Sequence, residues 1–127
     1  MARPPAKELT ERELQVMQVF WQSGEASATE ARDRLEAAGL DLAYVTVANL
    51  IRIVLEKGFL EQINDERPYR YRAARSFDQV SNSLVGDLLR RVFQGSREQL
   101  LLNVLKRRRL TAKERALLRE ILEEQES

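Results

Sequence analysis

Residues 43–57 combine an apolar face with an opposite face whose side chains can make specific hydrogen bonds. The apolar positions recur with the three-and-four spacing of a buried helix face. On the other face, an asparagine amide can form two hydrogen bonds with adenine and an arginine guanidinium can do the same with guanine. Hydroxyl groups in the first turn, and one near the start of the preceding helix, can reach phosphate oxygens. The residues at these positions are Thr29, Tyr44, Val45, Thr46, Ala48, Asn49 and Arg52.

A second stretch that could do chemistry is a run of four arginines within nine residues that contain no acidic side chain. Side chains on an extended strand alternate between two faces, so Arg70 and Arg72 share one face. Tyr69 and Tyr71 take the other face. Together with Arg67, such a strand could hold DNA phosphates, and its affinity would fall steeply with salt. The alternative is an exposed edge strand whose charges prevent aggregation.

The residue types that the chain lacks exclude several kinds of chemistry. It contains neither histidine nor cysteine, and therefore has no thiolate nucleophile and none of the usual zinc ligands. No carboxylates pair with a recognisable spacing, so we expect no enzyme activity, no cofactor and no metal site. There is no run of about 18 apolar residues and no leader at residues 1–5, so we expect a cytoplasmic protein that does not enter membranes.

Overall charge gives little information about the partner, because the net charge is only +1. A DNA-binding surface would therefore depend on the local placement of charges. The near-zero charge also supports a rival hypothesis, in which the chain is a protein-interaction module that does not bind DNA.

Five capping boxes mark the starts of helices. In each, a serine or threonine precedes a glutamate or glutamine by three residues, so that each side chain can bond the other's backbone N–H. The pairs are Thr10–Glu13, Ser27–Glu30, Ser76–Gln79, Ser96–Gln99 and Thr111–Glu114. Apolar periodicity predicts helices over 11–22, 28–38 and 43–57, then strands over 59–64 and 69–73. This order is typical of a winged helix-turn-helix, whose second helix of the pair enters the major groove. In that setting the polar face of 43–57 is better explained by DNA reading than by solvation alone.

Three further helices are predicted after the hairpin, one beginning at Phe77 and two over 97–106 and 112–125. Residues 88–122 contain fourteen large apolar side chains, more than three short helices can easily bury. A core shared with a second copy would bury them, because obligate dimer interfaces resemble a divided core; a single intramolecular bundle is the alternative. The residues assigned to dimerisation are Leu84, Leu88, Val92, Leu101, Val104, Leu105, Leu117 and Ile121.

The expected fold is therefore mainly α. It comprises a winged helix-turn-helix domain over 1–75, with three helices and a β-hairpin wing, and a three-helix dimerisation domain over 76–127.

Four motifs occur in a particular order along the chain. They are Leu-Thr-Glu-Arg-Glu-Leu at 9–14 with Val16, Met17 and Trp21, Ala-Tyr-Val-Thr-Val at 43–47, Glu-Lys-Gly-Phe-Leu at 56–60 and Tyr-Arg-Tyr-Arg-Ala at 69–73. In order and spacing they resemble the penicillinase-repressor family of winged-helix regulators, which control beta-lactamase and methicillin-resistance genes.

The resemblance implies a homodimer that binds a two-fold symmetric operator in double-stranded DNA and blocks transcription. It places the start of the recognition helix at Tyr44, Val45 and Thr46, and the wing at 67–72. The chain departs from the family at Ile53, a position at which other members often have arginine. In this chain the arginine, Arg52, stands one position earlier. The operator sequence is therefore not carried over from the family.

In some members of the family, an inactivating protease releases the repressor by cutting the fifth helix between an asparagine and an aromatic residue. Asn103 stands at that position here, and Val104 replaces the aromatic residue. Other relatives sense copper through a cluster of cysteines. Because this chain contains no cysteine, copper sensing is disfavoured.

Overall fold

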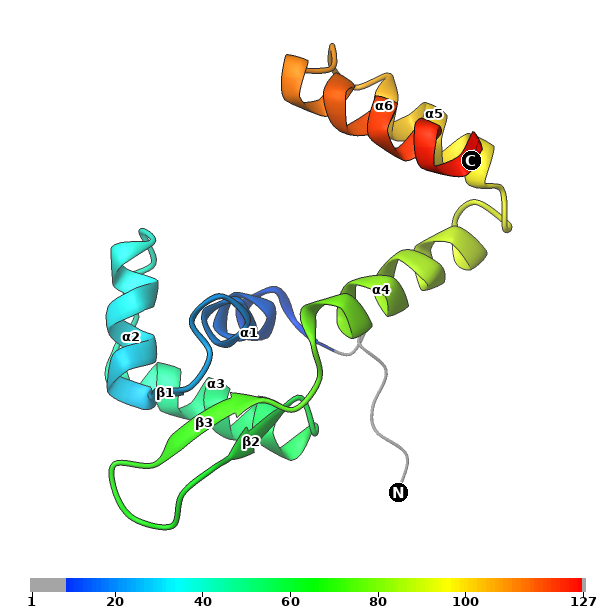
Figure 1. Ribbon diagram of the computed structural model, residues 1–127. Helices are drawn as coiled ribbons and strands as arrows, with labels where there is room; N and C mark the ends of the chain where they lie inside the picture. Colours follow the sequence, from blue (N-terminus) through cyan, green and yellow to red (C-terminus); the bar gives the residue numbers. More distant parts are fainter. Residues whose placement is uncertain (1–8, 127) are drawn as a thin grey trace. The chain divides into compact units, whose positions relative to one another are not determined.

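The computed structural model describes residues 9–126. The chain divides into two compact units between Asp87 and Leu88. The first unit contains α1 (Glu11–Ser23), β1 (Ala26–Ser27), α2 (Ala28–Ala37), α3 (Tyr44–Glu56), β2 (Leu60–Gln62) and β3 (Arg70–Ala73) (Figure 1). The second contains the end of α4 (Phe77–Arg91), together with α5 (Arg97–Leu105) and α6 (Ala112–Glu126). The predicted order of three helices, a hairpin and three further helices is confirmed.

Side chains cap the helices as the sequence predicts. Four of the capping boxes are complete, with a hydrogen bond in each direction between backbone N–H and side chain. These are Thr10–Glu13, Ser27–Glu30, Ser76–Gln79 and Thr111–Glu114. At the start of α5, the backbone N–H of Gln99 donates to the hydroxyl of Ser96 at 3.2 Å. A cap of this kind contributes about 1 kcal/mol, so these starts are fixed by local sequence.

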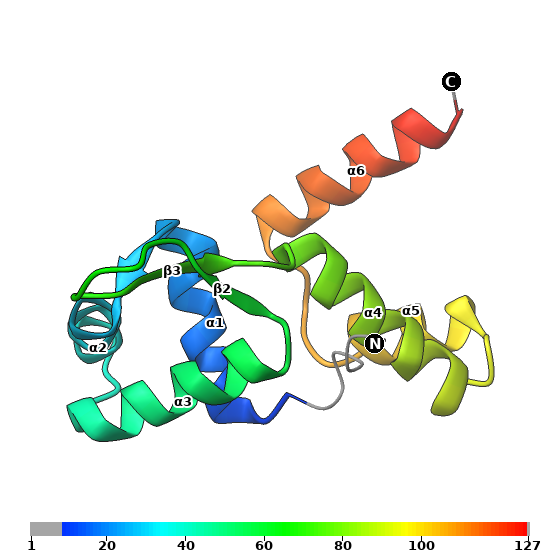
Figure 2. The same cartoon turned by 90° about the horizontal axis from the view of Figure 1, so that it is seen from below.

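The core of the first unit forms where α1, α2 and α3 pack against one another and against the sheet (Figure 2). α1 buries Val16, Met17 and Phe20 in this core. α3 buries one stripe of its surface through Val47, Ile51 and Val54. Fully burying one such side chain contributes about 1.5–3 kcal/mol. The packing therefore holds α3 in one rotation about its axis, with the opposite face turned outward.

The sheet has one strand more than the sequence predicts. Its order is β1-β3-β2 with antiparallel neighbours, and β1 pairs Ala26 with Tyr71. On the other edge, β2 pairs Leu60 with Ala73. The prediction missed β1 because two residues are too short for an alternating pattern. The strands of the hairpin are also shorter than expected, at three and four residues.

The first part of α4 belongs to the first unit. The indole N–H of Trp21 donates to the carbonyl of Arg75 at 2.9 Å, and its ring meets Phe77 edge-on with centroids 5.5 Å apart. Val80 is fully buried in the core. Leu84, which the sequence assigns to dimerisation, packs partly buried against the same core. The boundary between the two units therefore follows Asp87, whereas the sequence places it after residue 75.

The second unit exposes most of its large apolar side chains. Neither α5 nor α6 contains a buried residue among the positions that the structure describes. Side chains exposed here include Leu88, Val92, Leu101, Leu102, Val104, Leu105, Leu117, Ile121 and Leu122. Within residues 9–126, no helix is both long and apolar enough to cross a membrane.

Candidate nucleic-acid interface

The pair α2 and α3 is joined by a short turn that presents α3 at the surface. Gly39 in this turn has φ of 94°, a backbone conformation that glycine adopts without a steric cost. The backbone N–H of Leu40 bonds the carbonyl of Leu35 at 2.8 Å, which closes the end of α2. Leu40 and Leu42 then pack against the core. The turn therefore starts α3 with its first residues in solvent.

Along α3, Val45, Asn49 and Arg52 lie on the face opposite to the buried stripe, and Tyr44 and Thr46 are exposed in its first turn. Tyr44 is 49% and Val45 67% exposed. Thr46, Asn49 and Arg52 are exposed as well, and Ala48 lies at the edge of the buried stripe.

Arg52 forms an ion pair with Glu56 one turn further along α3, with 3.2 Å between Nη1 and Oε1. Both side chains are more than half exposed. An exposed pair of this kind contributes only about 0.3–0.5 kcal/mol, so the guanidinium can leave it for a stronger partner.

The wing loop between β2 and β3 is organised by one asparagine. The amide nitrogen of Asn64 donates to the carbonyls of Glu66 and Pro68 at 2.9 and 3.1 Å. Its amide oxygen accepts the backbone N–H of Arg70 at 2.7 Å. Asparagine often bonds nearby backbone groups in turns, so its place between the two strands is the signal that could have identified this residue.

The arginines of the wing differ in their partners. The guanidinium of Arg70 bonds Glu25 at 3.0 Å and Glu30 at 2.6 Å, and that of Arg72 bonds Glu61. The pKa of Glu30 is lowered, first by the backbone N–H of Ser27 and then by Arg70. Arg70 thus ties β3 to the start of α2, a partnership that a local reading of the wing could not reveal.

Arg67 is different. Within the described residues, no carboxylate lies within 4.0 Å of its guanidinium, which stands 5.6 Å from the centroid of the Tyr69 ring. This arginine is exposed at the tip of the wing. It is therefore the wing arginine with most freedom to take an external anion.

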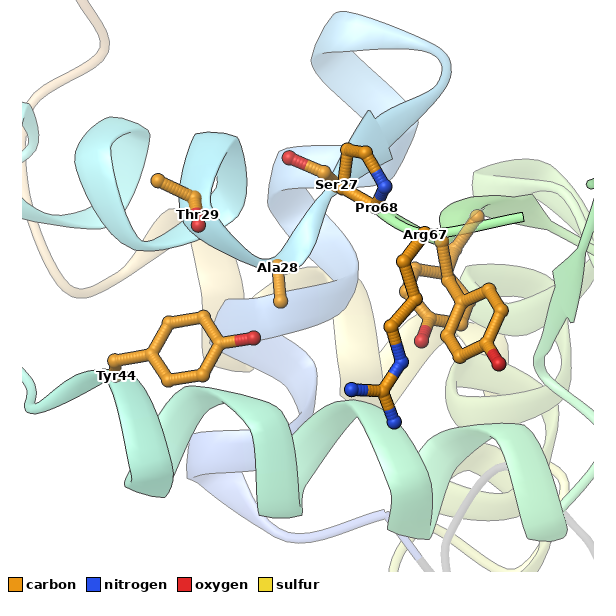
Figure 3. A pocket seen from close by; sticks show the side chains of 8 residues that line it. Ser27, Ala28, Thr29, Tyr44, Arg67 and Pro68 are labelled. Atoms are coloured by element: carbon orange, nitrogen blue, oxygen red, sulfur yellow. The ribbon is translucent and has the colours of Figure 1, made fainter.

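A hollow of about 490 Å³ lies where the starts of α2 and α3 meet the wing. We call it the tyrosine hollow; its lining residues are Ser27, Ala28, Thr29, Tyr44, Arg67, Pro68, Tyr69 and Tyr71. Tyr44 projects from the first turn of α3, and Arg67 extends from the wing into the same space (Figure 3). Burial raises the pKa of Tyr71, and the nearby phenols of Tyr44 and Tyr69 raise it further. A tyrosine hydroxyl can donate a hydrogen bond.

The structure thus brings some of the predicted contact residues together and leaves others apart. Thr29, Tyr44, Arg67 and Tyr69 line the tyrosine hollow. Asn49 and Arg52 lie further along α3, one and two turns beyond Tyr44. Across residues 9–126, no cluster of acidic side chains could hold a metal ion.

The fold and this surface define a winged helix-turn-helix regulator of transcription that binds DNA. The penicillinase repressor family model matches residues 9–124, and the chain belongs to that family. The methicillin resistance regulatory protein MecI, both from Staphylococcus aureus and from Mammaliicoccus sciuri, is 24% identical over 115 residues. This match covers 91% of the chain and 93% of MecI.

Solved structures support the fold. A complex structure of RosR from H. salinarum has a TM-score of 0.55 at 16% identity and covers 96% of both chains. A mutant of MarR from E. coli has a TM-score of 0.50 at 17% identity, covering 95% of this chain and 80% of that one.

Proposed function

We propose that this chain is a repressor that binds a two-fold symmetric operator as a homodimer, with α3 in the major groove and the wing on the backbone. The observation that carries the proposal is the outward face of α3, where Asn49 and Arg52 are exposed. Asparagine and arginine are the side chains best suited to read adenine and guanine. Such a role belongs in the cytoplasm if the chromosome lies there, and we propose that location.

Within the proposal, residues divide into base-reading and phosphate-holding groups. Asn49 and Arg52 would contact base edges, and Val45 and Ala48 would pack against them. Thr29, Tyr44, Thr46 and Arg67 would contact phosphates, since hydroxyl and guanidinium groups serve that purpose. Arg70 and Arg72 would contribute less than the sequence alone suggests, because each is already paired with a carboxylate.

Dimerisation through the second unit is supported by its exposed apolar side chains. Val92, Leu101 and Val104 are each more than half exposed in the single chain. Burying such surface between two copies is strongly favourable, at about 25 cal/mol for each Å² of apolar area. A dimer would also present two recognition helices to successive major grooves about one helical turn apart.

Release by proteolysis is the third part of the proposal. Asn103 and Val104 are exposed in the last turn of α5 in the single chain, so a protease would reach them when the dimer dissociates. Cleavage there would separate α6 from the rest of the chain and remove part of the proposed dimer surface.

The experiment that tests the proposal selects bound duplexes from a randomised DNA pool and sequences them. We expect enrichment of a two-fold symmetric sequence with half-sites about 10 base pairs apart from centre to centre. A dimer that enriches no sequence would support the rival function, a protein-interaction module. One observation favours that rival. Arg70 and Arg72 form ion pairs with carboxylates of the same chain, so their charges are partly neutralised before any DNA is bound.

A further inference from the structure

All three tyrosines of the chain line the tyrosine hollow, although they come from two different elements and the wing loop. Tyr44 begins α3, Tyr69 ends the wing loop and Tyr71 lies in β3. A DNA phosphate alone would need hydrogen-bond donors and positive charge, not three aromatic rings around it. The gathering of rings therefore indicates a ligand with an aromatic surface of its own.

The charge of the lining is equally one-sided. Arg67 is the charged residue among those that line the hollow, and it is positive. The hydroxyls of Thr29, Tyr44 and Tyr71 add hydrogen-bond donors. The ligand should therefore carry a negative group beside its ring.

The size of the hollow fits a small molecule. Its volume of about 490 Å³ lies within the range of roughly 300–1,000 Å³ that is usual for ligand sites. Arg67 can meet a carboxylate with two parallel hydrogen bonds. The ring of Tyr44, left half exposed in the chain alone, could then be covered by the ring of the ligand.

We propose that the tyrosine hollow binds a small aromatic anion, and that this ligand and DNA exclude each other. The second part rests on the proposed function, because Tyr44, Thr29 and Arg67 are then also contacts to DNA. An occupant of the hollow would take the donors that would otherwise meet phosphates. The ligand would act as an inducer without any cleavage of the chain.

The first test measures ligand binding to the full chain without DNA, by isothermal titration. The probe is 2-naphthoate, compared with 2-naphthamide, which keeps the rings without the charge, and with inorganic phosphate, which keeps the charge without the rings. We expect naphthoate to bind at least about tenfold more tightly than either. If phosphate bound as tightly as naphthoate, the hollow would be a phosphate site only. If naphthamide bound as tightly, it would be an apolar surface without charge selectivity. Either result overturns the proposal, and so does the absence of naphthoate binding.

Variants locate the probe. Arg67→Gln should weaken naphthoate binding by about tenfold or more, because it removes a charge-assisted pair of hydrogen bonds. Arg72→Gln is the matched control, since Arg72 lies in the same wing, pairs with Glu61 and does not line the hollow. Its naphthoate affinity should be unchanged. Tyr44→Ala should weaken binding and Tyr44→Phe should largely keep it. Naphthoate affinity that is equal in Arg67→Gln and the unaltered chain would overturn the assignment.

The second test repeats an operator titration with naphthoate present at ten times its own Kd. Mutual exclusion predicts that the apparent Kd for operator rises about elevenfold. Unchanged operator affinity with the hollow occupied would overturn the exclusion. If the chain binds no DNA at all, the proposed function fails, and the ligand site is still decided by the first test and its variants.

Discussion

Replacing Lys57 with methionine should destabilise the first unit by about 2 kcal/mol. The ammonium group of Lys57 lies 2.7 Å from Oε1 of Glu13, and this contact joins the end of α3 to the start of α1. The Glu13 side chain is 6% exposed and that of Lys57 26%. Breaking a fully buried pair costs about 3–5 kcal/mol, and an exposed pair is worth about 0–1 kcal/mol, so an intermediate value applies here.

Thermal unfolding followed by the fluorescence of Trp21, the single tryptophan, reports on the unit concerned. For a unit of this size, a loss of 2 kcal/mol corresponds to a fall in Tm of roughly 8–16 °C. All samples must be at one protein concentration, because dimerisation would also affect Tm. The matched control is Arg52→Met, which breaks the exposed pair with Glu56 on the same helix and should cost only about 0.3–0.5 kcal/mol.

The effect of Lys57→Met should also depend on pH. Burial raises the pKa of Glu13, but the hydrogen bonds from Lys57 and Thr10 outweigh burial and hold the pKa below its ordinary value of 4.5. A carboxyl with a lowered pKa stabilises the fold above about pH 4.5. This contribution is lost as the pH falls through the pKa of the carboxyl in the folded state. The difference between the variant and the unaltered chain should therefore shrink on acidification. A difference under about 0.5 kcal/mol at pH 7, or one that is the same at pH 7 and pH 3.5, would refute this reasoning.

The remaining predictions concern DNA and the dimer. Asn49→Ala should reduce the discrimination between the preferred and a wrong base pair by about 1–3 kcal/mol in competition binding, without weakening affinity for random DNA. Arg67→Gln should weaken binding to all sequences and reduce the slope of log K against log salt by roughly 2 for a dimer; an altered base preference would contradict this role. Ile121→Glu should convert a dimer to a monomer in light scattering, because it places a charge in the proposed interface. Its neighbour change Glu120→Lys should leave the dimer intact, and a dimer in both variants would argue against this interface.

Features that depend on neighbouring residues in the chain could be predicted from the sequence. The capping boxes at Thr10 and Ser27 involve residues three apart, and both form as expected. The two faces of α3 follow from apolar spacing alone, so the exposure of Asn49 and Arg52 was predictable. Helix order and the wing followed from the same local patterns.

Features that depend on contacts between distant residues could not. Arg70 finds its partners at Glu25 and Glu30, forty or more positions away, so a wing that is free of acids in sequence is paired with acids in space. β1 forms because its two residues pair with the free edge of β3. Two residues are too few to show an alternating apolar pattern in the sequence. The tyrosine hollow also arises only when the wing folds back toward the start of α3.

Fluorescence anisotropy at physiological salt tests most directly whether α3 reads one DNA sequence while the wing holds the backbone. The full chain is titrated against the symmetric duplex found by selection and against a duplex of the same composition in scrambled order. We expect the symmetric duplex to bind at least about 1,000-fold more tightly, as is usual for specific regulators. Equal affinity for the two duplexes at that salt concentration would contradict it.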